Sequence, residues 1–349
     1  WRLPHAILKG GNMKRFLTLI LFVIPIYAFS MNLPQLFQSS QASNTTYAIA
    51  NITLKQASMT YQMNMIQSSV PVINQGGQIS AQIAYTSSLQ TYQNDIKSYY
   101  SNVLNAAFGV KIANINVEIA QMNLNVATMN YASTLALFQK TMASTVSLQQ
   151  ASVTVATDQN NLKNAVWNYN FNLSNFQNVT GSKWQEITFS VPDLSKIPQD
   201  MKTWINSDLN LKLANLNLQN AQYNLNTTPS NSSQYTIEMA KMAVQQDLLN
   251  QSNALLSSQN NYSSSIQKLE YDYQSVLNAK ANLDISTNNL VFYTNEYNSG
   301  LISTVNYLSQ YKIPYLNAQL SYYNSLETYW NDLVPYIVSI GLKPEVALQ

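Results

Sequence analysis

The side chains that most often perform catalysis or bind metals are scarce in this sequence. After residue 30 it contains no His, no Cys and no Arg, which excludes a Ser-His-Asp triad, a Cys-His pair and any disulfide there. Carboxylates such as Glu270 and Asp272 fall on one predicted helix among polar neighbours, two positions apart and facing different sides. No Gly-rich phosphate loop occurs either. We therefore predict no catalytic residue, no metal site and no cofactor, and we expect that the chain is not an enzyme.

Two hydroxyl-rich turns are the chemically distinctive segments that remain. Ser144-Thr145-Val146 recurs in the second half of the chain as Ser303-Thr304-Val305, each time between two long helix-like stretches. A hydroxyl at such a place can cap the helix that follows, so we predict that Ser144 or Thr145, and Ser303 or Thr304, are N-caps. Gly300 precedes the second triplet and would tolerate a left-handed backbone, whereas the first turn has Thr141 there. The two turns need not be alike.

The elements that position these turns must be exceptionally long helices. Two runs of about 60 residues, 78–139 and 235–298, contain no Pro and no Gly apart from Gly109. As helices, they would be about 90 Å long at ~1.5 Å per residue. Runs of this length without a helix breaker favour a mainly α fold built from long antiparallel hairpins.

The helix expected over residues 104–138 carries two apolar stripes on different faces, which predicts neighbours on two sides. Both a cylindrical wall of helices and a flat helical bundle are consistent with this pattern. The stripes are, first, Ile112, Ile115, Ile119, Met122, Val126 and Met129, and second, Val117, Leu124, Tyr131 and Phe138 beside Ala113, Ala120 and Ala127.

The sequence is also internally duplicated. Residues 44–57 match residues 208–221, and each half closes on a glycine, Gly181 or Gly341. We therefore predict a first repeat at 31–181, a connector at 182–203, a second repeat at 204–341 and a tail at 342–349.

The N-terminal residues have the composition of an export signal. In residues 13–30, Lys14-Arg15 precede an apolar run and then small residues, which is typical of a signal peptide. A single membrane anchor is the alternative, but the run is shorter than the ~20 residues that a spanning helix needs. We interpret residues 1–12 as an upstream translated segment.

The net charge of the remaining chain is slightly negative. Residues 31–349 contain 14 Lys and 16 acidic residues, which gives a net charge of −2. No nucleic-acid partner is therefore expected, because binding to phosphates calls for a clustered positive surface.

Over nearly its whole length after residue 30, the chain resembles the TolC family of outer-membrane efflux and secretion channels. The resemblance rests on four segments in order: NLPQLFQSSQASNTTYAIA from Asn32, VPVINQGGQISAQIAY from Val70, FQNVTG ending at Gly181, and YNSGLISTVNYLSQ from Tyr297. In the second segment Val70-Pro71 and Gly76-Gly77 look like the family's junction between strand and long helix. The resemblance implies a homotrimer whose duplicated protomers build a twelve-helix α-barrel. It also implies docking to a periplasmic adaptor and an inner-membrane pump, and an equatorial segment at 182–203.

Two departures from the family pattern concern the gate and the membrane. Where family members have acidic residues just after the tip turn, this chain has Ser147, Asn306 and Ser309, so a gate would rely on neutral contacts. Tyr297 matches a family tyrosine and is the best candidate, although simple packing at the helix end explains it equally well.

The membrane strands are the second departure. A spanning strand needs about 10 residues, and neither 66–75 nor 226–234 is long enough to cross a bilayer twice. We predict few or no strands. The expected function is an export channel component in the outer membrane or periplasm of a double-membraned bacterium. The alternative is a non-conducting periplasmic spacer derived from the same family.

Overall fold

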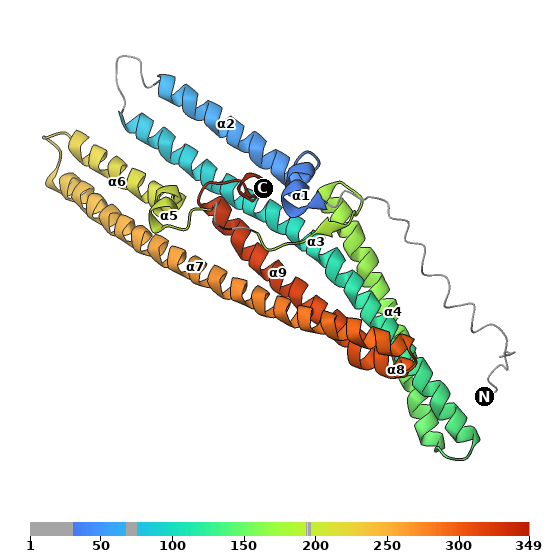
Figure 1. The fold of residues 1–349 in the computed structure, drawn as a ribbon. Coiled ribbons are helices and arrows are strands. Elements are labelled where there is room, and N and C mark those ends of the chain that lie inside the picture. The colour runs from blue at the N-terminus through green and yellow to red at the C-terminus, as the bar shows by residue number, and fades with distance from the viewer. Residues whose placement is uncertain (1–30, 68–74, 193, 195–196, 349) are drawn as a thin grey trace.

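Long helices dominate the computed structural model, which describes residues 31–67, 75–192, 194 and 197–348 (Figure 1). Helices α3 (Gln75–Gln139) and α7 (Gln234–Asn298) have 65 residues each and form the two main rods. At about 1.5 Å per residue, each is close to 100 Å long. The two runs without helix breakers thus form the long helices predicted from them.

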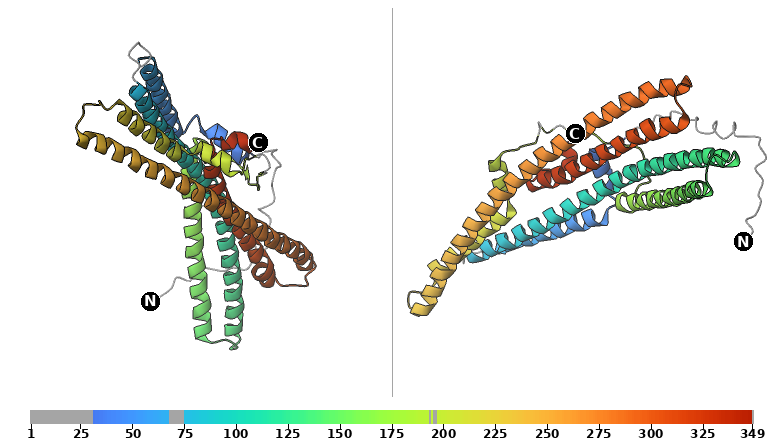
Figure 2. Two further views of the ribbon diagram at one scale, coloured as in Figure 1. Left: turned by 90° about the vertical axis from the view of Figure 1, so that its left-hand side faces the viewer. Right: turned by 90° about the horizontal axis from the view of Figure 1, so that it is seen from below.

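Shorter helices line each rod in the same way in both halves of the chain. Helices α2 (Thr45–Gln67) and α4 (Thr145–Thr180) pack along the first and second parts of α3. Helices α6 (Leu209–Thr227) and α9 (Ile313–Ser339) pack likewise along α7. The short helix α8 (Thr304–Tyr307) and the π-helical turn η2 (Leu308–Lys312) precede α9. The α3–α4 and α7–α9 hairpins point to the same end of the molecule and separate towards their tips (Figure 2).

The internal duplication is evident in the helix boundaries. The rods α3 and α7 have the same length, and the triplets Ser144-Thr145-Val146 and Ser303-Thr304-Val305 follow their ends at the same spacing. The described strands are only β1 (Met31–Asn32) and β2 (Ile187–Thr188), a parallel pair of two residues each. The predicted fold class, mainly α with two tandem hairpin repeats and few strands, is confirmed.

The helices form a single curved layer rather than a closed bundle. Helix α3 contacts α2 and α4 on one side and α6 and α9 on the other, and α7 packs against α6 and α9. The order across the layer is therefore α2/α4, α3, α6/α9 and α7. Its two edges, α2/α4 and α7, each pack mainly against one neighbouring row of helices.

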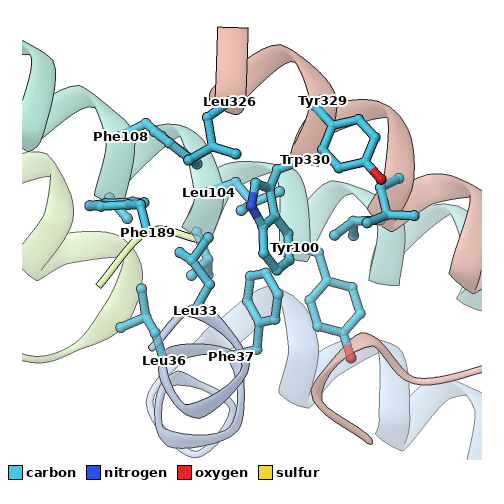
Figure 3. Packing of buried hydrophobic residues seen from close by; sticks show 14 of the residues in the cluster. Leu33, Leu36, Phe37, Tyr100, Leu104, Phe108, Phe189, Leu326, Tyr329 and Trp330 are labelled. Atoms are coloured by element: carbon cyan, nitrogen blue, oxygen red, sulfur yellow. The ribbon is translucent and has the colours of Figure 1, made fainter. Parts of the chain in front are cut away.

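The main core lies at mid-length, where α1 (Leu33–Ser40) packs against α3 and α9 (Figure 3). Phe37 meets Tyr100 edge-on, with ring centroids 5.0 Å apart, and also lies against Trp330 at 6.4 Å. The buried Trp330 donates its indole N–H to the carbonyl oxygen of Ser190 at 3.0 Å. This bond ties α9 to the segment that links the two halves.

The linking segment packs on the long helices rather than only on itself. The ring of Phe189 lies 4.4 Å from that of Phe108 on α3, and Lys111 pairs with Glu186 at 2.7 Å. Further along, Tyr336 on α9 donates to the carbonyl oxygen of Pro198 at 2.8 Å, just before α5 (Met201–Ser207). These contacts attach the segment across α3 and α9.

The C-terminal residues also belong to the core. Helix α10 (Pro344–Ala347) contacts α1, and Glu345 is only 6% exposed. Its carboxylate accepts hydrogen bonds from the Tyr100 hydroxyl and, at 2.8 Å, from the Gln41 amide. A buried carboxylate is tolerated because both of its oxygens have donors. Burial and this acceptor together raise the pKa of Tyr100.

The connection between α6 and α7, at the end opposite the tips, is short. Helix α6 ends at Thr227 and α7 begins at Gln234, and no strand lies between them in this described stretch. Val70 and Pro71, part of the segment that resembles the family's junction between strand and long helix, lie outside the described residues. Gly76 and Gly77 lie in the first turn of α3. One described helix, α3, holds a stretch long and apolar enough to cross a membrane by length and composition, but 50% of that stretch is buried, as is usual for a core helix.

Candidate functional site

The first tip is the turn between α3 and α4. Thr141 has a φ of +60°, the only positive φ among the described non-glycine residues, and the amide of Met142 donates back to the carbonyl of Leu137 at 2.9 Å. Ser144 then caps α4, with its Oγ accepting the amide of Ser147 at 3.0 Å. The turn thus closes α3 with a left-handed residue and opens α4 with a hydroxyl.

The second tip has the same backbone. Gly300 has a φ of +76°, and the amide of Leu301 donates to the carbonyl of Glu296 at 3.0 Å. Ser303 Oγ accepts the amide of Asn306 at 3.2 Å and caps the returning helix. The serines, rather than Thr145 and Thr304, are therefore the N-caps. The two turns themselves differ in side chains but share the same backbone conformation.

We expect Thr141→Gly to stabilise the first tip by about 1 kcal/mol, because a β-branched residue in the left-handed region is strained. Hydrogen exchange of the Met142 amide measures the local opening free energy, and protection should rise. The reciprocal change, Gly300→Thr, should lower protection of Leu301 by a similar amount. Unchanged protection in both variants would show that the turns carry no backbone strain.

The side chains at the predicted gate positions are uncharged, and the two serines among them form hydrogen bonds with residues three or four positions earlier in the chain. Ser147 Oγ lies 2.9 Å from Ser144 Oγ, and Ser309 donates to the carbonyl of Val305 at 2.8 Å. Ser147, Ser309 and Asn306 are all exposed. No group of three or more His, Cys, Asp or Glu that could hold a metal occurs among the residues described. The described tip residues therefore offer hydrogen-bonding groups but no cluster of side chains that would bind a metal ion.

Tyr297 packs inside its own hairpin. Its ring stacks on Tyr307 with centroids 4.6 Å apart and an interplanar angle of 11°, and Thr304 donates to its hydroxyl at 3.5 Å. One turn further from the tip, Tyr293 stacks on Tyr311 at 3.6 Å and 16°. Hydrogen bonding to Tyr293 raises the pKa of Tyr311. The second hairpin is thus closed near its tip by two stacked tyrosine pairs.

Comparison with known proteins identifies the architecture. No protein-family model matches the sequence, and neither does any curated protein. Solved structures do match. The CmeC outer membrane channel of Campylobacter jejuni is similar with a TM-score of 0.58 at 14% identity, over 89% of this chain and 85% of that one. The outer membrane protein VceC of Vibrio cholerae gives 0.59 at 11%, over 88% and 96%. The open MtrE outer membrane channel of Neisseria gonorrhoeae gives 0.56 at 12%, over 89% of each.

The chain has the fold of these outer-membrane channels. The TolC-like fold that the sequence resemblance implied is therefore confirmed. The similar structures are channels rather than enzymes, in keeping with the scarcity of catalytic side chains after residue 30.

Within this TolC-like fold, sequence reasoning missed three of the four stacked tyrosines. Tyr293 and Tyr297 are four residues apart at the end of α7, as are Tyr307 and Tyr311 on the returning arm of the hairpin. This i, i+4 spacing on two facing helix ends was the available signal. The equivalent positions of the first tip include Phe138 and no tyrosine.

The π-helical turn η2 was also missed, and its cause is local. Pro314 lies at the start of α9 and has no amide hydrogen to donate to the carbonyl four residues earlier, at Gln310. The helix accommodates this by widening over Leu308–Lys312. The corresponding position in α4 is Val155, and α4 is uninterrupted. The second tip therefore has both a proline-induced bulge and a tyrosine stack, and the first has neither.

Proposed function

We propose that this chain is a TolC-like export channel component. Three copies would form a twelve-helix periplasmic tunnel for small molecules or proteins, seated in or below the outer membrane and served by an adaptor and an inner-membrane pump. The observation that supports this most is the fold itself, which matches outer-membrane channels over about nine-tenths of the chain. In this proposal the tips gate by neutral contacts, with Tyr297 as the central residue.

The open edges of the layer support assembly with further copies. Large apolar side chains are exposed on both edges, and many recur at the three-, four- or seven-residue spacing of helix-packing seams. On α2 they are Ile49, Ile52, Met59, Met63 and Ile66, and on α7 they include Met242, Leu249 and Leu256. A second copy that placed its α2/α4 edge against α7 would cover both lines.

The α2/α4 edge also carries an aromatic pair, on the part nearer the tips that is formed by α4. Trp167 and Phe171 on α4 stack with ring centroids 5.8 Å apart, yet are 66% and 59% exposed. Val146 and Val153, also exposed, precede Trp167 at seven-residue multiples along the same face. Aromatic side chains of this kind are the usual anchors of protein interfaces. In a cyclic trimer, each copy would present this face to the α7 edge of its neighbour.

The absolute mass of residues 31–349, measured by light scattering with and without detergent, tests the assembly. A trimer that needs detergent indicates a membrane-seated tunnel, and a detergent-independent trimer indicates a soluble tube. A monomer or an antiparallel dimer would overturn the channel proposal.

Trp167→Asp should shift the trimer to monomers while leaving helix content unchanged. The indole is mostly solvent-exposed in one chain, so its loss costs the protomer little, whereas a buried charge at an interface would cost about 2 kcal/mol or more per contact. Mass by light scattering and far-UV circular dichroism report the two effects. Asn168→Asp, which adds the same charge at the next residue, is the control and should remain trimeric. Loss of the trimer in both variants would mean that added charge, and not the missing indole, disrupts assembly.

A non-conducting spacer is the second candidate. It is favoured by the short connection from Thr228 to Ser233, which is too short for strands that cross a bilayer. Solute flux through vesicles that contain the purified trimer separates the two functions. Flux supports the channel, whereas a stable trimer without flux supports the spacer.

A further inference from the structure

A mostly apolar cavity of about 350 Å³ lies where the two halves of the chain meet, between α2, α3, α5, the start of α6 and the turn after α9. Ile96 in its wall is only 6% exposed, whereas Leu342 is 38% exposed, so the cavity reaches from the surface into the core. Concave sites of this size with mainly apolar walls are typical of small-molecule binding sites. The apolar side chains that line it include Tyr47, Leu89, Tyr92, Ile96, Leu209 and Leu342.

Several polar side chains in the walls already bond to other parts of the protein. The Tyr100 hydroxyl donates to Glu345, and Gln93 Nε2 donates to the carbonyl of Val338 at 2.9 Å. The Ser207 hydroxyl donates to the carbonyl of Ile340, just after α9, at 3.2 Å. Because these donors have protein acceptors, the surface that is left for a ligand is mainly hydrocarbon.

Two lysines supply the charge in the described lining of the cavity. Lys212 lies in the first turns of α6 and Lys343 precedes α10, and both are exposed, as a charge at the mouth of an apolar cavity must be. No described carboxylate lines the cavity. Glu345 and Asp208 lie outside the lining and accept hydrogen bonds from the Gln41 amide and from backbone amides in the first turn of α6. The mouth therefore favours an acidic group over a basic one.

The volume of the cavity limits the length of the ligand. A cavity of about 150 Å³ lined by aliphatic and aromatic side chains binds one benzene molecule. On that scale, a volume of about 350 Å³ takes a chain of roughly ten to twelve carbons. That is enough for one medium-length chain and too little for the two chains of a phospholipid.

We propose that this cavity binds a medium-chain fatty acid. The hydrocarbon chain lies against Leu89, Tyr92 and Ile96, and the carboxylate stays at the mouth near Lys212 and Lys343. Burial of the chain supplies most of the affinity, and the two ammonium groups select the acidic headgroup. This site does not depend on conduction, on assembly or on the proposed function.

Decanoate is the probe, added to the full chain below the concentration at which it forms micelles, and calorimetry should show saturable binding. Acetate, which has the carboxylate without the chain, should show no binding. Decyltrimethylammonium, which has the same chain with a cationic head, should bind more weakly by about fivefold or more. No saturable binding of decanoate would overturn the proposal, and equal binding of the two amphiphiles would overturn the choice of an acid.

A photoreactive analogue of decanoate, with a diazirine near the end of its chain, tests the location. Cross-links mapped by mass spectrometry should fall on residues 89–96 of α3 and should be lost when unlabelled decanoate is in excess. Cross-links on the exposed apolar lines of α2 or α7 instead would show that the chain binds at the open edges, and would refute the cavity as the site.

The double variant Lys212→Gln with Lys343→Gln should weaken decanoate binding by about tenfold, because each exposed ammonium contributes modestly. Its binding of decyltrimethylammonium should not weaken. Lys55→Gln with Lys140→Gln removes two other exposed lysines, which do not line the cavity, and should bind decanoate like the parent. Equal weakening in both double variants would mean that the net charge of the chain, and not these two side chains, attracts the acid.

Discussion

Replacing Gly181 with Ala should destabilise the protein by about 3 kcal/mol or more, through strain in the left-handed backbone together with a collision. Gly181 ends α4 with a φ of +72°. A Cβ at this position would lie well inside van der Waals contact with both Cβ and Oγ of Ser43. Ser43 cannot simply turn away, because its Cβ is fixed by the backbone.

The collision also affects the bonds that hold α4 to the turn between α1 and α2. Ser43 Oγ donates to the carbonyl of Thr180 at 2.7 Å, and Asn44 Nδ2 donates to that of Val179 at 2.9 Å. These two donors satisfy carbonyls at the end of α4 that have no partner within the helix. Moving Ser43 would leave at least one of them unpaired in a partly buried place.

Gly341→Ala is the matched control for this prediction. Gly341 closes the second half with a φ of +81°, but a Cβ there would meet nothing within 4 Å. It should cost only the backbone strain, about 1 kcal/mol. Urea unfolding followed by circular dichroism gives both free energies. Equal costs for the two variants would mean that Ser43 yields freely and that the collision carries no energy.

The sequence was sufficient for most features that depend on neighbours along the chain, although the π-helical turn before Pro314 was missed. The absence of Pro and Gly defined α3 and α7 to within a few residues, because an uninterrupted helix requires only local compatibility. The caps at Ser144 and Ser303 and the glycine at position 300 followed from the same local rules. Duplication then extended each local inference to a second place in the chain.

Contacts between distant segments were not predictable in this way. Lys97, Trp204 and Ser264 share one cavity although they come from three different helices, α3, α5 and α7. The carboxylate of Glu345, in what the sequence suggested was a tail, is buried against Tyr100. Apolar periodicity identified faces that need partners but not which helix covers them. In the first predicted stripe of α3, one member is buried within the chain and another is exposed, namely Ile115 and Met129.

A second pair of distant residues should make stability depend on pH. Asp272 on α7 is only 5% exposed, and its Oδ2 has no hydrogen-bond partner among the described residues. Asp332 on α9 also has a buried, unpartnered Oδ2, while its Oδ1 lies 2.6 Å from Lys268 Nζ. Two carboxylates cannot bond to each other, but a protonated Asp272 can donate to Asp332. Burial, this hydrogen bond and the charge of Asp332 raise the pKa of Asp272 to about 6, although Lys268 opposes the shift.

The direction of the effect follows from where the proton is bound. The folded chain holds a proton on Asp272 up to about pH 6, whereas the unfolded chain releases it near the ordinary value of 3.8. The favourable contribution of this proton is therefore complete below about pH 4 and is lost as pH rises through 6. The shift corresponds to a loss of about 2–3 kcal/mol between these limits.

Asp272→Asn should remove this pH dependence, because an amide mimics the protonated acid at every pH. We expect the variant to be more stable than the parent by about 2 kcal/mol at pH 8 and similar to it at pH 4. Urea unfolding at pH values from 4 to 8 measures the difference. Glu270→Gln, two positions earlier and exposed, removes the same charge and should follow the parent curve. The free energy of unfolding of Asp272→Asn could instead equal that of the parent at every pH. In that case Asp272 and Asp332 do not share a proton, and Asp272 is ionised in the folded chain.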